Sequence, residues 1–227
     1  MQLGALGGLF CSGSGTLGVL VKTSAESSDV FLLSCSHVIA NCGQFPVPFA
    51  DVVDFRKVIQ QPVSDTCDSQ ANRVGILQDD FSVFVSQADG VTDSDHALAL
   101  LDPDVAANTS TTQLATGNSI REFATEDPAS WQQSMVTQLL GAASQTFGSI
   151  LGFNGDTAEE IKFAGFGTVR FTGLVRYSNR SADGDSGAPV VDEQNRLLGL
   201  HVGGSSSGVA LFFPIGPYLL QKGLVLA

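Results

Sequence analysis

Short apolar runs, interrupted every few residues by Gly, Asn, Asp or Ser, dominate the hydrophobic pattern of this chain. Residues 15–22 and 29–35 form the first two runs and are joined by the polar turn Thr23 to Asp29. Runs of this length and spacing predict short strands. The other runs that predict strands cover residues 52–59, 73–77, 95–101, 134–140, 147–152, 162–177, 188–192, 196–203 and 208–214. We therefore expect an all-β fold.

The length of the chain allows two compact halves. Its 227 residues, 43% of them hydrophobic, can form two small β-barrels of about a hundred residues each. We expect an N-terminal barrel in residues 1–103 and a polar inter-barrel linker in residues 104–130. A C-terminal barrel then occupies residues 131–227.

Two shorter segments differ from the strand pattern. Residues 1–14 are rich in Gly and Ser and are expected to form a loose arm. Pro217 to Lys222 predicts a terminal helix, because proline suits the first helical turn and Gly223 suits a helix end.

The acidic composition narrows the range of partners. The chain has 23 Asp and Glu against 11 Lys and Arg, a formal net charge of −12, which repels phosphate backbones and anionic membranes. No stretch approaches the roughly 18 apolar residues of a membrane span, and Met1 to Phe10 lack the basic start of a signal peptide. We expect a soluble protein that binds neither nucleic acid nor membranes, and a cytoplasmic location is favoured.

Ser186 is the candidate nucleophile of the chain. It lies in the segment Ala182 to Val191, between Gly184 and Gly187 and just before an apolar run. A serine hydroxyl needs a base to remove its proton and donors to hold the oxyanion that forms. Glycine lets the backbone turn sharply there, so the N–H groups of Gly184 and Ser186 are candidates for those donors.

His37 and Asp95 are the candidate base and orienting carboxylate. His37 follows an apolar run that ends in small residues, and Asp95 opens another apolar run, where a carboxylate can be buried and fix the imidazole tautomer. Asp93 is an alternative carboxylate, but no apolar run directly follows it. His96 is expected to point away from Asp95, because successive side chains on a strand alternate in direction.

The order His, Asp, Ser with these local motifs resembles the trypsin-like (chymotrypsin-fold) serine peptidases. The segments Ser14 to Val21 and Leu198 to Gly204 are similar to the opening strand and the substrate-binding strand of that family. The Gly-Thr-Leu-Gly and Ser-x-x-His-Val sequences also resemble trypsin-like domains of bacteria and plants. The resemblance implies two antiparallel six-stranded barrels with a cleft between them, and a serine endopeptidase that works through an acyl-enzyme.

The same resemblance bears on specificity. The residue six before the nucleophile often lies at the base of the substrate pocket, and here it is Arg180, which argues against basic substrates. His201 resembles the pocket histidine of glutamyl endopeptidases and picornaviral cysteine endopeptidases, which they pair with a hydroxyl residue at the offset of Ser181. This implies a preference for Glu, Gln or Asp before the scissile bond. His201 as a buried strand residue, with Arg180 in solvent, is the alternative.

Extended substrates need a free strand edge. Val202, Gly203 and Gly204 follow His201 on the substrate-binding strand, and the two glycines leave room for a peptide to pair by β-augmentation.

Two cofactor motifs have weaker support. Residues 13–18 match Gly-x-Gly-x-x-Gly, but a strand follows them, whereas a dinucleotide site requires a helix. Cys35, His37, Cys42 and Cys67 could form a zinc site, but their spacing matches no common zinc template and the site would consume the candidate base. A Cys35–Cys42 disulfide and reduced thiols remain open, and Cys11 has no assigned role. We expect neither a metal nor another cofactor.

A second function class remains open on the sequence alone. The chain can be a protease-like module that holds a peptide or partner protein without cutting it, or a latent enzyme that a partner or processing activates. In trypsin-like zymogens a freed N-terminus pairs with the aspartate before the nucleophile, which is Asp185 here.

Overall fold

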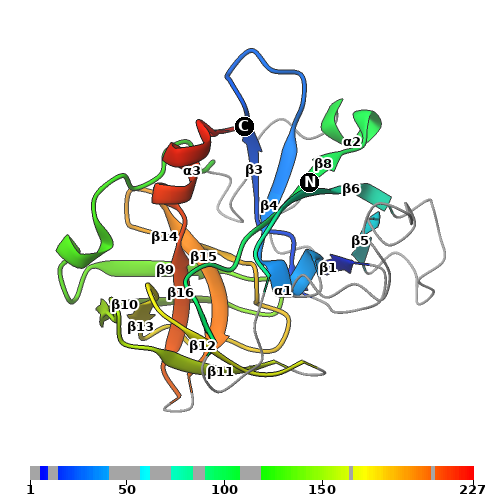
Figure 1. Ribbon diagram of the computed structural model, residues 1–227. Coiled ribbons are helices and arrows are strands. Elements are labelled where there is room, and N and C mark those ends of the chain that lie inside the picture. Colours follow the sequence, from blue (N-terminus) through cyan, green and yellow to red (C-terminus); the bar gives the residue numbers. More distant parts are fainter. Residues whose placement is uncertain are drawn as a thin grey trace.

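The chain folds into a closed barrel beside an open sheet (Figure 1). The computed structural model describes residues 6–9, 15–40, 57–61, 73–83, 90–107, 119–163, 166–205 and 208–227. No helix in these residues is long and apolar enough to span a membrane.

Six strands from the C-terminal half form the closed barrel. Neighbouring strands are antiparallel throughout. Their order around the barrel is β10 (Gln145–Phe153), β13 (Val175–Tyr177), β16 (Ala210–Pro214), β15 (Leu197–Gly204), β14 (Pro189–Val191) and β9 (Val136–Leu140). Tyr177, Phe212 and Leu139 are fully buried in its core. The predicted C-terminal barrel is confirmed.

Seven strands of the N-terminal half and β17 from the end of the C-terminal half form an eight-stranded antiparallel sheet. The strand order is β17 (Val225–Leu226), β3 (Val19–Lys22), β4 (Phe31–Ser34), β8 (Ala97–Leu101), β6 (Arg73–Phe81), β5 (Lys57–Gln61), β1 (Leu6–Leu9) and β2 (Gly15–Thr16). Leu32 and Leu33 are adjacent in β4 and both buried, so this strand is covered on both faces. The described strands do not close, so the predicted second six-stranded barrel is not confirmed.

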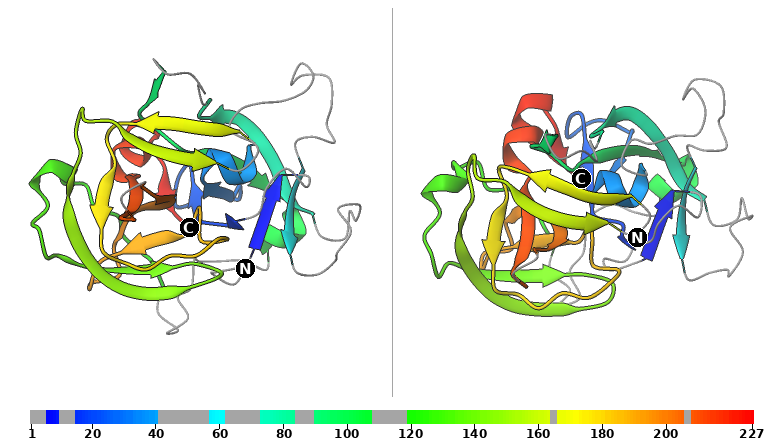
Figure 2. Two further views of the ribbon diagram at one scale, coloured as in Figure 1. Left: turned by 90° about the horizontal axis from the view of Figure 1, so that it is seen from below. Right: turned by 60° about the horizontal axis from the view of Figure 1, so that its bottom comes forward.

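A small third sheet connects the two halves. The hairpin of β11 (Glu159–Phe163) and β12 (Gly167–Phe171) leaves the C-terminal half, and β12 pairs in parallel with β7 (Val91–Thr92) of the N-terminal half. Figure 2 shows β11 and β12 passing beside α1 (Ser36–Ile39). The sequence pattern did not predict this crossing.

Short helices lie between some of the strands in the chain. Besides α1 they are α2 (Pro103–Ala107), the 3₁₀ helix η5 (Pro128–Ser130) and α3 (Gly216–Lys222). The predicted C-terminal helix is confirmed in α3, and Gly223 ends it with a φ of +65°. The predicted loose arm is wrong in part, because β1 lies within residues 1–14. The boundaries of the two halves and the linker stay a prediction.

Candidate active site

A short helix presents His37 at the end of a buried strand. β4 ends at Ser34, Cys35 stays extended with φ −70° and ψ 142°, and α1 begins at Ser36. The backbone N–H groups of Val38 and Ile39 donate to the Cys35 carbonyl, each at 3.1 Å. The change from extended to helical backbone within two residues holds His37 at a fixed point on the sheet.

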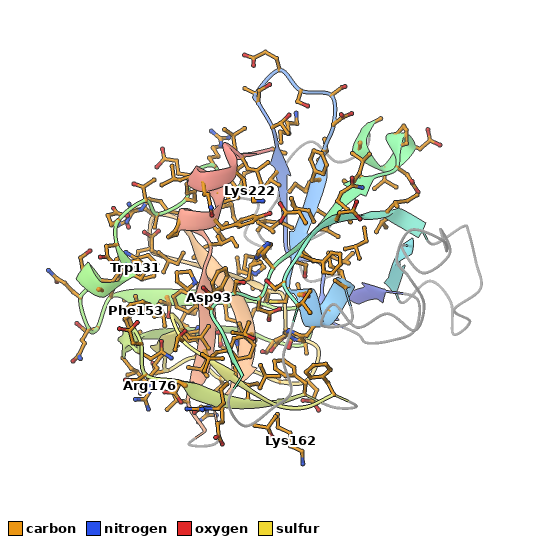
Figure 3. All side chains as sticks on the ribbon, viewed as in Figure 1. Asp93, Trp131, Phe153, Lys162, Arg176 and Lys222 are labelled. Carbon is orange, nitrogen blue, oxygen red and sulfur yellow. The ribbon has the colours of Figure 1, made fainter. Side chains whose placement is uncertain are left out.

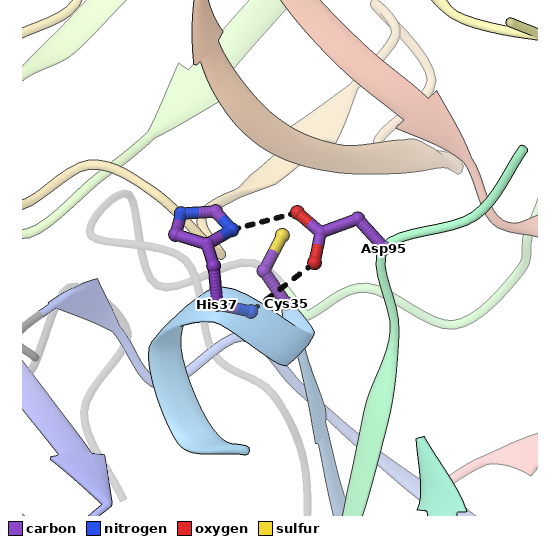
Figure 4. A group of neighbouring side chains, drawn as sticks. All are labelled: Cys35, His37 and Asp95. Atoms are coloured by element: carbon purple, nitrogen blue, oxygen red, sulfur yellow. Dashed lines mark hydrogen bonds and ion pairs between the residues drawn. The ribbon is translucent and has the colours of Figure 1, made fainter. Parts of the chain in front are cut away.

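Asp95 holds the imidazole of His37. The Asp95 side chain is 0% exposed, and its Oδ2 lies 2.7 Å from His37 Nδ1 (Figure 4). Its Oδ1 accepts the backbone N–H of His37 at 3.3 Å. Because a carboxylate accepts hydrogen bonds, Nδ1 carries the ring proton and Nε2 keeps its lone pair. Asp93, the alternative carboxylate, is labelled in Figure 3, and its side chain is exposed rather than buried.

The β11–β12 hairpin covers the other side of this imidazole. The ring of Phe163 on β11 lies 4.6 Å from the ring of His37, centroid to centroid, at an angle of 51°. An aromatic contact at this distance limits the rotation of the imidazole. His37 is therefore held by one element from each half of the molecule.

His96 belongs to a separate cluster. Its Nε2 lies 3.3 Å from Asp80 Oδ1, and its ring contacts the ring of Tyr218 at 4.1 Å between centroids, tilted by 37°. Burial lowers the pKa of His96, although the Asp80 carboxylate partly opposes this shift. Tyr218 and Lys222 also contact Asp80, at 3.1 and 2.9 Å, so the cluster fixes α3 on the N-terminal sheet.

Ser186 lies in the loop before β14, directly against the N-terminal sheet. Its carbonyl accepts the N–H of Thr16 at 2.7 Å. A Cβ on Gly15 would come within 2.7 Å of both that carbonyl and Val38, so glycine permits the close approach. Val38 is the next residue after His37, and Ser186 therefore lies beside the helix that carries the candidate base.

A second set of contacts connects the same segments. The His201 carbonyl accepts both the N–H of Gly187, at 2.8 Å, and the thiol of Cys35, at 3.3 Å. The hydroxyl of Ser186 donates to the Val202 carbonyl at 3.2 Å. In this structure the candidate nucleophile therefore points along β15.

The loop leaves two backbone donors open. Asp185 N–H donates to the Ala182 carbonyl at 3.1 Å, and the Asp185 carbonyl accepts the N–H of Ala188 at 2.9 Å. Gly184 has a φ of +100°, which favours glycine. Among the described residues, the N–H groups of Gly184 and Ser186 have no acceptor. These are the two donors that the sequence suggested.

His201 is buried on β15 and bonded to a tyrosine. It is 2% exposed, and its Nδ1 lies 2.7 Å from the hydroxyl of Tyr177. Burial lowers the pKa of His201 to about 4 and raises the pKa of Tyr177, so both rings are neutral near neutral pH. Tyr177 has no other acceptor among the described residues, so its hydroxyl donates to Nδ1 and the ring proton lies on Nε2.

The other predicted specificity residues lie on the surface. Arg180 and Ser181 are exposed, and no described contact joins either of them to His201. β14 pairs with β15 as far as Leu200, whereas β16 pairs as far as Gly204. Beyond His201, one edge of β15 therefore has no partner strand among the described elements.

Cys35, His37 and Asp95 are the residues in the described part of the chain that could hold a metal. Their ligand atoms lie within 4.8 Å of one another (Figure 4). A metal ion there would have to replace the proton between His37 and Asp95, so metal binding and base chemistry exclude each other. The predictions for Cys11, Cys42 and Cys67, including the Cys35–Cys42 disulfide, lie outside the described residues.

Sequence reasoning missed Tyr177 and Phe163. The chain has two tyrosines, and each contacts a histidine: Tyr177 contacts His201, and Tyr218 contacts His96. A rare polar aromatic residue within an apolar run was the available signal for Tyr177. Phe163 gave no such signal, because it is one of 15 phenylalanines.

Comparison with known proteins decides the family. The family model of the trypsin-like peptidase domain matches residues 13–200. The chain belongs to the trypsin-like peptidase family. Membership makes this trypsin-like peptidase a hydrolase that acts on proteins or peptides. No curated protein matches its sequence.

Solved structures share the fold of this trypsin-like peptidase. Thermobifida fusca protease A has 18% identity and a TM-score of 0.60, with 100% of this chain and 97% of that chain covered. A glutamic-acid-specific serine protease has 16% identity and a TM-score of 0.66, with both chains fully covered. Nocardiopsis protease has 16% identity and a TM-score of 0.61, with coverages of 99% and 97%. At these identities the likeness concerns the fold alone.

Proposed function

We propose that this peptidase is a serine endopeptidase in which Ser186 is the nucleophile, His37 the base and Asp95 the orienting carboxylate. The 2.7 Å bond between buried Asp95 and His37 carries the proposal. It fixes the tautomer that leaves Nε2 as a base. The contact of Thr16 with the Ser186 carbonyl supports it further, since it brings the nucleophile loop to the same half of the molecule.

The chemistry follows the order of these contacts. The Ser186 side chain turns from the Val202 carbonyl toward His37, gives its proton to Nε2 and attacks the substrate carbonyl carbon. The N–H groups of Gly184 and Ser186 hold the oxyanion. His37 then protonates the leaving amine, and an acyl-enzyme remains on Ser186. Water, deprotonated by His37, releases the acid product.

Covalent labelling and cleavage mapping test this function together. The purified chain and its Ser186→Ala variant are treated with a fluorophosphonate and, separately, with a diverse peptide pool read by mass spectrometry. We expect labelling and cleavage with the unaltered protein and neither with Ser186→Ala. Equal cleavage by both proteins would contradict the role of Ser186 as the nucleophile. Peptide binding without labelling or cleavage would instead indicate a binding module.

We propose further that the peptidase prefers Glu, Gln or Asp before the scissile bond, with Arg180, Ser181, His201, Val202, Gly203 and Gly204 contacting the substrate. The ring of the neutral His201 also hydrogen-bonds to the backbone of Leu211, so a substrate amide or carboxylate oxygen would accept the Nε2 proton by replacing that bond. Support also comes from the glutamic-acid-specific neighbour, whose description states that a histidine triad binds its substrate. The open edge of β15 suits an extended peptide.

Tyr177 supplies a sharp test of the specificity proposal. Tyr177→Phe keeps the ring but removes the hydroxyl that donates to His201 Nδ1, so the imidazole loses its preferred tautomer. We expect kcat/KM to fall about tenfold or more for peptides with Gln or Glu at that position and to change little for a matched Leu peptide. His201→Gln should show the same selective loss. An equal fall on all three peptides would mean that His201 is structural.

A further inference from the structure

The Asp185 carboxylate is buried beside the nucleophile and surrounded by neutral donors. It is 0% exposed. Its Oδ1 accepts the N–H groups of Ala143 and Ser144 at 3.0 and 2.9 Å. Its Oδ2 accepts the N–H of Ala182 at 2.8 Å and the hydroxyl of Ser144. Four donors supply the stabilisation that a buried carboxylate requires.

Two of those backbone donors and the hydroxyl come from one turn between β9 and β10, residues 141–144. The turn is closed by the N–H of Gly141, which donates to the Ser144 carbonyl at 2.9 Å. A Cβ on Gly141 would lie 2.0 Å from Asp185 Oδ1. The turn can therefore approach the carboxylate only because glycine occupies this position.

Thr16 connects this turn to the nucleophile loop. Its buried hydroxyl donates to the Gly184 carbonyl at 2.9 Å and accepts the N–H of Ala142, also at 2.9 Å. Its own N–H donates to the Ser186 carbonyl. One residue of β2 therefore contacts both the loop and the turn.

These contacts fix the backbone on both sides of the two open donors. The peptide unit that follows Gly184 is held through its carbonyl by Thr16 and through its N–H by the Ala182 carbonyl. Ser186 is held through its carbonyl, again by Thr16. The N–H groups of Gly184 and Ser186 are thus oriented before any substrate arrives, which is the condition under which such donors stabilise an oxyanion well.

We propose that Ser144 and Thr16 are positioning residues for the oxyanion donors, and that they assemble the nucleophile loop without a liberated amino terminus or an activating partner. The proposal rests on the serine endopeptidase function above. In this proposal, hydrogen bonds from within the chain stabilise the Asp185 carboxylate, and no positively charged group is needed. In the described residues, no Lys or Arg side chain forms an ion pair with Asp185.

Hydroxyl deletions in the full chain test the positioning role. Ser144→Ala and Thr16→Val each remove one hydroxyl, and Ser144→Thr and Thr16→Ser keep it. We expect kcat to fall 10- to 100-fold in the deletions while KM changes less than about threefold, because the donors act on the transition state. The conservative variants should recover most of kcat. Ser149→Ala, which removes an exposed hydroxyl bonded to Ser178, is the control.

A transition-state analogue separates positioning from a general loss of structure. A peptide boronate forms a tetrahedral adduct on the serine, so its affinity should fall in parallel with kcat/KM across these variants. Binding of an uncleaved substrate peptide, measured with Ser186→Ala added to each variant, should stay within about threefold. Unchanged kcat in Ser144→Ala and Thr16→Val would overturn the proposal, as would equal losses of boronate and substrate binding.

Blocking the amino terminus tests independence from processing. The full chain with an uncleaved N-terminal tag should be labelled by a fluorophosphonate as fast as the untagged chain. Labelling that appears only after the tag or the N-terminal residues are removed would overturn this proposal and leave the endopeptidase function intact. A chain that is labelled in neither form would overturn both.

Discussion

Hydrogen-bond partners fix the tautomers of the two histidines near the nucleophile. Asp95 accepts from His37 Nδ1, so that ring keeps a basic Nε2. Tyr177 donates to His201 Nδ1, so that ring keeps its proton on Nε2. One imidazole can therefore accept a proton, whereas the other can donate a hydrogen bond. The two roles differ because the partners differ.

The first residue-scale prediction concerns Asp95. Asp95→Asn keeps the shape of the side chain, but its amide can donate to Nδ1 and stabilise the wrong tautomer of His37. We expect kcat to fall by about 10⁴-fold. The exposed neighbour Asp93 provides a matched control, because Asp93→Asn makes the same chemical change outside the pair. Steady-state kinetics on one peptide substrate measures kcat of both variants. A large loss of kcat in Asp93→Asn alone would show that Asp93, and not Asp95, orients His37.

The sequence revealed the site residues that belong to local motifs but not those that reach them from a distance. Ser186, His37 and Asp95 each lie in a recognisable segment, and their order in the chain resembles a known family. Ser144 lies outside any recognised motif, and the Gly-Thr-Leu-Gly sequence that contains Thr16 gave no sign of a contact with the nucleophile loop. Thr16 contacts a backbone group 126 positions away, and no pattern along the chain encodes such a contact.

At the scale of elements, the apolar runs predicted most of the strands. β3, β4, β8 and β9 lie within predicted runs. The missed strands are short or rich in glycine: β1 has the sequence LGGL, and β7 and β17 have two residues each. Such strands form because a neighbouring strand offers hydrogen bonds, so tertiary structure rather than local sequence decides them.

The β11–β12 hairpin gives a prediction at this scale. Phe163→Ala removes the ring that contacts the imidazole of His37, and a displaced imidazole should lower kcat/KM by roughly tenfold. Phe163→Leu restores part of the bulk and should restore part of the activity. Phe147→Ala, on the exposed face of β10 with 72% of its residue surface accessible, should leave kcat/KM unchanged. Equal kinetics for Phe163→Ala and Phe147→Ala would show that the hairpin does not position the base.

At the scale of the whole molecule, two strand pairings join the halves in ways that the sequence did not predict. β7 of the first half pairs with β12 of the second, and β17 returns from the second half to β3. The N-terminal sheet thus includes residues that lie more than two hundred positions apart. Whether a sheet closes into a barrel depends on which strands pair at its edges. The number of strands does not show these pairings, so it led us to predict a second barrel.

Acid stability gives a prediction for the whole molecule. Burial lowers the pKa of His201 from 6.5 to about 4, so between these values the unfolded chain binds more protons than the folded chain. Stability therefore falls as the pH falls through this window. Between about pH 7.5 and about pH 5, this one group should cost about 2 kcal/mol of unfolding free energy.

Urea unfolding of the unaltered protein and His201→Gln at both pH values measures this contribution. His96 and Asp80 are present in both proteins, so their effects largely cancel in the comparison. We expect the unaltered protein to lose about 2 kcal/mol more than the variant on acidification. The same pH dependence in both proteins would contradict the prediction.

The return of β17 to β3 has a consequence for how the protein comes into being. On the ribosome, residues are released from first to last, and the edge strand that covers β3 is made from Val225 and Leu226. The sheet that carries His37 therefore lacks this edge strand until Val225 and Leu226 have been synthesised, long after β3. Until then, a nascent chain holds its candidate base on a sheet with an open edge.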